Sequence, residues 1–146
     1  MFRTFVLLTL SMALTACDTP MLFTAGGELS GSVQNAPATW QFAEDSGLAQ
    51  LETRPTDPYS INLAYVQLDG RLYIYAGNTR TNWVEHIEQN ALVRIRVNEI
   101  IYPARAERVT DNDELVAFAA EWAGRSMFQR DPMQFDEVWL YRLEAP

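Results

Sequence analysis

The stretch from Ile61 to Ala76, INLAYVQL-DG-RLYIYA, decides the fold. Two runs rich in β-branched and aromatic residues flank Asp69-Gly70. This dipeptide favours the positive φ angles of a two-residue hairpin turn. The stretch therefore predicts an antiparallel hairpin whose strands are Ile61–Leu68 and Arg71–Ala76.

Short strands separated by turn residues continue on both sides of the hairpin. Pro103 lies inside one of them and has no N–H to donate, so we expect an edge or a bulge at that point. The other expected strands are Glu28–Val33, Thr39–Ala43, Leu48–Thr53, Leu92–Val97, Ile100–Val109 and Asp136–Leu143.

Two short helices interrupt the strands. Asn82 is expected to cap the first, with Glu85 completing a capping box, and this helix should end near Asn90. Asp111 is expected to cap the second, which presents one apolar stripe and stops at Gly124. The stripe consists of Leu115, Phe118, Ala119 and Trp122. The pattern predicts one mainly β (α+β) domain, a closed or nearly closed antiparallel barrel of about six to seven strands.

The order of these elements, from about Thr39 to Glu144, resembles the flavin-binding split-barrel superfamily. Its members include pyridoxamine-phosphate-oxidase-like proteins and deazaflavin-dependent nitroreductases. The segments that carry the resemblance are LETR at 51–54, VQLDG at 66–70, LYIY at 72–75, NTRTNW at 78–83 and EQNALVRI at 88–95. The resemblance implies a split β-barrel, a cofactor such as FMN or a deazaflavin, and a homodimer.

The resemblance also implies a cofactor site. It places Arg54 and the loop Asn78-Thr79-Arg80 around the cofactor phosphate, and Trp83 beside the cofactor ring. A helix N-terminus and an arginine both suit a phosphate. Other interpretations stay open: a salt bridge for Arg54, an exposed loop position for Arg80, a core position for Trp83. We expect His86 to be a surface or half-buried residue.

Two functions follow from these observations. The first is a flavin- or deazaflavin-dependent oxidoreductase, similar to nitroreductases and quinone reductases, in which the protein mainly binds and orients the cofactor. Prolines and Asp57 follow Arg54, and the chain contains no lysine. These two features favour the alternative, a non-enzymatic envelope lipoprotein without a cofactor that binds a hydrophobic small molecule or a protein partner.

The N-terminus has the pattern of an export signal. An apolar run from Phe5 to Leu14 is too short to span a membrane and is typical of a signal peptide. Leu14-Thr15-Ala16-Cys17 then resembles the lipobox of bacterial lipoproteins. We therefore expect a signal peptide at 1–16, lipidation of Cys17, a tether at 17–27 and the barrel domain at 28–146. Asp18 favours the periplasmic face of the inner membrane, and the outer membrane stays open.

The charge balance excludes one class of partner. The chain has 19 acidic and 11 basic residues, a net charge of −8 that becomes −9 when Arg3 leaves with the signal peptide. Such an acidic chain is unsuited to binding nucleic acid. Cys17 is the single cysteine, so no disulfide forms within the chain. The sequence shows no metal-ligand spacing and no Ser-His-Asp arrangement with supporting context.

Overall fold

A computed structural model of the 146-residue chain describes residue 20 and the ranges 24–125 and 129–146. Cys17, Asp18 and the expected signal peptide lie outside these residues. The elements are β1 (Ser32–Val33), β2 (Ser46–Thr53), β3 (Tyr59–Leu68), β4 (Arg71–Gly77), α1 (Asn82–Gln89), β5 (Leu92–Val97), β6 (Ile100–Arg108), α2 (Asn112–Gly124), a 3-10 helix (Pro132–Gln134) and β7 (Val138–Glu144).

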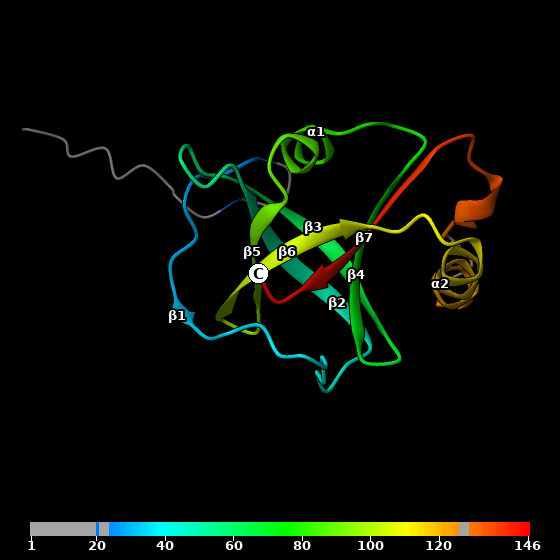
Figure 1. The fold of residues 1–146 in the computed structure, drawn as a ribbon, viewed down its shortest axis with the longest axis horizontal. Helices are drawn as coiled ribbons and strands as arrows, with labels where there is room; N and C mark the ends of the chain where they lie inside the picture. Colours follow the sequence, from blue (N-terminus) through cyan, green and yellow to red (C-terminus); the bar gives the residue numbers. More distant parts are fainter. Residues whose placement is uncertain (1–19, 21–23, 126–128) are drawn as a thin grey trace, which may run out of the picture.

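The sheet closes into a barrel. Six antiparallel strands follow the order β6-β5-β2-β3-β4-β7, and the pairing of β6 with β7 closes the ring. β1 pairs with β6 in parallel and adds a short seventh strand. Figure 1 shows α1 above one end of the barrel and α2 beside it. The predicted mainly β barrel with two short helices is confirmed.

Pro103 lies in β6, a strand that pairs with β5, β1 and β7. Ile100 and Ile101 pair with β1, and Arg105 to Arg108 pair with β7 along the same edge. The N–H of Ala106 faces β5, because it donates to the carbonyl of Ala91 at 2.9 Å. Since N–H directions alternate along a strand, the nitrogen of Pro103 faces the gap between β1 and β7. The proline therefore costs no ladder hydrogen bond, as expected for an edge position.

The predicted hairpin forms as β3 and β4. Asp69 and Gly70 have φ angles of 50° and 74°, and Leu68 pairs with Arg71 across the turn. Both central residues therefore have the positive φ that this two-residue turn requires. A side chain at position 70 would also place its Cβ 2.5 Å from Thr39 Cγ2, so glycine is required on two grounds.

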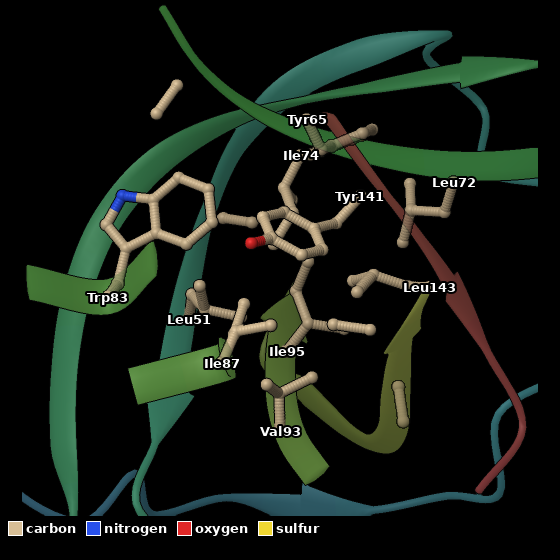
Figure 2. Close-up of a cluster of buried hydrophobic side chains, with 14 of the residues drawn as sticks. Leu51, Tyr65, Leu72, Ile74, Trp83, Ile87, Val93, Ile95, Tyr141 and Leu143 are labelled. Atoms are coloured by element: carbon tan, nitrogen blue, oxygen red, sulfur yellow. The ribbon is translucent and has the colours of Figure 1, made fainter. Parts of the chain in front are cut away.

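The apolar core has two parts. The barrel interior, drawn in Figure 2, holds the inward-facing residues Leu51, Ile74, Ile95 and Leu143 together with residues of α1. A second cluster lies outside the barrel wall, where Phe118 of α2 covers Val66, Tyr73 and Leu140. Strands under α2 are buried on both faces, which explains their nearly continuous apolar sequences.

The stretch Thr39–Ala43 was predicted to be a strand, and that prediction is wrong. Trp40 is buried and its indole Nε1 donates to the Leu143 carbonyl at 2.9 Å. The Phe42 amide donates to the Gln67 side chain at 2.7 Å instead of to a neighbouring strand. Side-chain partners, with one backbone bond from the Trp40 amide to the Gly70 carbonyl at 2.8 Å, thus take the place of a strand ladder. Of the expected strand Glu28–Val33, only Ser32–Val33 pairs.

The two helix caps differ from each other. Asp111 Oδ1 accepts from the Glu114 amide at 2.8 Å, as predicted for α2. The capping box predicted for α1 does not form. Thr81 is the N-cap, no side chain caps the helix, and Asn82 is already helical.

A partly buried ion pair attaches the N-terminal segment to the barrel. Glu52 is 3% exposed and its side chain lies 3.0 Å from Arg94 of β5. Glu52 Oε2 also accepts from the Leu29 amide at 2.5 Å, and Arg94 donates to the Leu29 carbonyl at 2.9 Å. Leu29, only 1% exposed, is thereby held on the outer wall of the barrel.

Replacing Arg94 by alanine should leave the Glu52 carboxylate buried without its cation. We expect the free energy of unfolding in urea to fall by about 2–3 kcal/mol. Arg105→Ala is the matched control, because Arg105 and Glu107 form a pair with side chains 51% and 43% exposed. That variant should lose less than about 0.5 kcal/mol. Equal losses in the two variants would show that the partly buried pair has no special role.

Candidate functional site

The loop between β4 and α1 contains three of the predicted phosphate-binding residues. Asn78 has a positive φ of 62°, and its amide donates to the Glu137 carbonyl at 3.0 Å. The Thr79 amide donates to the Gly77 carbonyl at 2.8 Å, which makes a tight turn. Asn78, Thr79 and Arg80 are all exposed. The loop therefore presents its side chains to solvent directly before a helix N-terminus.

The Arg80 guanidinium has an exposed acidic partner. It forms an ion pair with Glu88 near the other end of α1, and the two side chains are 51% and 37% exposed. Exposed ion pairs contribute about 0–1 kcal/mol, because water screens them and ordering two long side chains costs entropy. A phosphate dianion can therefore compete with Glu88 for Arg80.

The first turn of α1 has unsatisfied polar groups. No side chain caps it, and the buried hydroxyl oxygen of Thr81 has no hydrogen-bond partner. The first amides of a helix point outward and carry a partial positive charge. This end of α1 therefore has the chemistry that binds an anion.

Trp83 is a core residue in this structure. Its side chain is 6% exposed, and its ring lies 5.9 Å from the Tyr141 ring in an edge-on arrangement. Figure 2 shows the indole directed toward Tyr141 within the interior cluster. This burial matches the core interpretation of Trp83 and leaves no exposed indole face beside the loop.

Arg54 lies away from Arg80. It follows β2 with a φ of 57°, forms an ion pair with Asp57 at 3.2 Å and lies 5.5 Å from the Tyr59 ring centre. Arg54 acts electrostatically on His86, whereas Arg80 pairs with Glu88. His86 and Glu88 are two positions apart on α1, so their side chains point in directions that differ by about 200°. The two arginines, each beside one of these residues, therefore lie on opposite sides of α1.

A second polar cluster, which the sequence did not reveal, surrounds His86. Its Nδ1 lies 2.9 Å from the hydroxyl of Thr53, and the Tyr59 ring packs edge-on against it at 4.9 Å. Thr53 ends β2 and Tyr59 begins β3, so the β2–β3 turn brings both to α1. Burial, and then the charge of Arg54, lower the pKa of His86 below 6.5.

The arrangement fits the phosphate of a flavin cofactor but not its ring. The loop 78–80 and the start of α1 suit a phosphate. The buried Trp83 cannot stack on a cofactor ring. Five surface cavities of about 230 to 480 Å³ are lined by residues other than Arg54, Asn78, Thr79, Arg80 and Trp83. Among the described residues, the loop 78–80 and the start of α1 thus have the chemistry of an anion site, and these five cavities lie elsewhere.

Solved structures of other proteins superpose on this barrel. An FAD-binding protein from Mesorhizobium loti superposes with a TM-score of 0.52 and 17% identity, covering 67% of this chain and 78% of that one. A pyridoxamine 5′-phosphate oxidase-like protein from Listeria innocua gives 0.53 and 10%, covering 67% and 82%. The chain therefore shares its barrel fold with these two proteins. At these identities the likeness concerns the fold alone. No family model and no curated protein matches the sequence.

The described residues contain neither a metal-binding cluster nor a membrane-spanning helix. Within 24–125 and 129–146, no group of three or more His, Cys, Asp or Glu side chains is arranged to hold a metal ion. None of the helices in these ranges has the length and apolar content that crossing a membrane requires.

His86 is the single histidine of the chain, so its pKa can be measured without overlap from other histidines. By NMR titration we expect its pKa below 6.5, and Arg54→Ala should raise it because a nearby positive charge is removed. Arg80→Ala, on the other side of α1, is the control and should leave the pKa unchanged.

The same pKa sets a pH dependence of stability. A histidine with a lowered pKa in the folded state binds its proton more readily when unfolded. The free energy of unfolding should therefore fall as pH drops below 6.5 toward the folded-state pKa. His86→Gln should remove this part of the slope. A slope identical in both proteins would contradict the assignment.

Proposed function

We propose that the protein is a lipid-anchored flavin- or deazaflavin-dependent oxidoreductase, of the nitroreductase or quinone-reductase kind, that holds the cofactor phosphate at the start of α1. The observation that carries the proposal is the uncapped first turn of α1, where the Thr81 hydroxyl has no partner and Arg80 is weakly paired. The shared fold supports the class of cofactor.

Each residue near the start of α1 has its own role in holding the cofactor. Asn78, Thr79 and the amides of the first helical turn bind phosphate oxygens, and Arg80 exchanges Glu88 for the phosphate. When bound, the cofactor supplies hydride transfer to a nitro or quinone-like acceptor. Trp83 holds α1 on the barrel from inside, which keeps the loop in place. Arg54 acts on His86 and is not assigned to the phosphate.

The proposal includes a homodimer. Because Trp83 is buried, it offers no exposed ring face to the cofactor beside the loop. A second copy packed near the start of α1 supplies a wall for the ring. Light scattering of the detergent-purified protein tests this part, and a monomer that binds flavin would contradict it.

Titration with FMN and with a deazaflavin, followed by cofactor fluorescence, tests the binding. Arg80→Ala should weaken binding about tenfold, the value of one charged hydrogen bond. Glu88→Gln should tighten it, because the change removes both a competitor and a negative charge. Arg105→Ala is the control for a lost arginine and should bind as the unmodified protein does.

A second candidate function is non-enzymatic binding of a hydrophobic small molecule or a protein partner. The buried Trp83 ring and the absence of loop 78–80 from the five cavities favour it. Failure of both cofactors to bind at high micromolar concentration would contradict the oxidoreductase.

The anchor is a separate part of the proposal. Cys17 carries the lipid, and the barrel faces the periplasm from the inner membrane, which Asp18 favours over the outer membrane. Cys17→Ala should move the protein from the membrane fraction to the soluble fraction, since a lipoprotein is held by its acyl chains. Asp18→Ser is the matched control and should stay membrane-bound. An unlipidated Cys17 in the mass spectrum would contradict the anchor.

A further inference from the structure

Two described residues between the expected lipid and the barrel, Pro20 and Gly26, are attached to the barrel wall. Asn62 of β3 donates through Nδ2 to the Pro20 carbonyl at 3.3 Å, and Pro20 is buried. Gly26 exchanges two backbone hydrogen bonds with Ser60 of β3, at 2.8 and 2.9 Å. Leu29 is buried as well, so Pro20, Gly26 and Leu29 each contact the barrel.

These contacts begin close in sequence to the expected lipid. Cys17 precedes Pro20 by three residues. A fully extended chain spans about 3.5 Å per residue, so the lipidated residue lies within roughly 10 Å of Pro20. A body of this size cannot turn Pro20 away from the bilayer on so short a connection. The β2–β3 wall, to which Pro20 is bonded, must therefore lie near the lipid.

Part of the outer surface of that wall is uncharged. We call the outward side chains of Leu48, Gln50, Asn62 and Ala64 the β2–β3 face; Leu48 pairs with Ala64 and Gln50 with Asn62. Leu48 is 74% exposed. None of the four side chains is ionised, although the whole chain has a net charge of −8. Contact with an anionic bilayer therefore meets no repulsion from the face itself.

The surroundings of the β2–β3 face carry charges of both signs. On β5, Arg96 donates to the Gln50 side chain at 2.8 Å and also pairs with Glu99, which is 86% exposed. The wall on the far side of the ring is different. There β6 and β7 pair Arg105 with Glu144 and Glu107 with Arg142. The uncharged surface with an exposed leucine thus lies on the wall that holds the tether.

We propose that the β2–β3 face contacts the surface of the lipid bilayer, with Leu48 inserted among the headgroups. The proposal rests on the lipidation of Cys17 that is part of the proposed function. It fixes the orientation of the barrel: β2 and β3 lie toward the membrane, and β6 and β7 lie toward the periplasm.

Site-specific fluorescence on the intact lipoprotein tests this orientation. The full chain is expressed, purified from membranes and reconstituted in phosphatidylethanolamine–phosphatidylglycerol vesicles containing a headgroup-nitroxide lipid. Cys17 is consumed by the lipid, so an introduced cysteine is the one free thiol. A fluorophore on Leu48→Cys should lose roughly half or more of its emission, because it lies at headgroup depth. A fluorophore on Arg105→Cys should be unaffected. Ala64→Cys repeats the measurement beside position 48.

The outcomes separate the two proposals. Mass spectrometry of the purified protein reads the lipid on Cys17 before any fluorescence is measured, and an unlipidated chain overturns both the anchor and the orientation. A lipidated chain with equal quenching at positions 48 and 105 overturns the orientation alone. Stronger quenching at 48 and 64 than at 105 supports it.

Discussion

The pairing of β6 with β7 is the constraint on which the rest of the structure depends. It joins the two ends of a six-stranded sheet, so the barrel strands gain partners on both sides. Closure also decides where the helices lie. Because β4 and β5 are not neighbours in the ring, the chain between them crosses an end of the barrel, and α1 forms on that crossing. The position of loop 78–80 follows, since Asn78 extends the β4–β7 ladder to Glu137.

The same closure places α2 over the outside of the barrel wall. The chain from β6 to β7 leaves the barrel and returns to the adjacent strand, so α2 packs on the outside of the wall. Tyr73 lies on the outward side of β4 and is nevertheless only 2% exposed. Its hydroxyl donates to Glu114 of α2 at 2.7 Å, and burial with this bond raises the pKa of Tyr73 to about 12. Outward positions of β4 therefore belong to a core.

Local sequence patterns predicted the elements whose partners are close in the chain. The turn at Asp69-Gly70 and the alternation in β5 depend on adjacent residues, and both form as predicted. The coil at Trp40 and the ion pair of Glu52 with Arg94 depend on residues far along the chain. Neither partner could be identified from its neighbours. For the site, the sequence identified a loop before a helix, but it could not show that α1 separates Arg54 from Arg80.

The start of α1 is the proposed working end of the barrel, and the β2–β3 face is its proposed membrane side. Amide chemical shifts of the ¹⁵N-labelled protein, recorded with and without FMN, test the first of these most directly. Binding of the phosphate should shift the amides of Asn78 to Trp83 and leave those of β6 near Arg105 in place. Flavin that shifts other amides while these stay still, or that shifts none, would contradict the account.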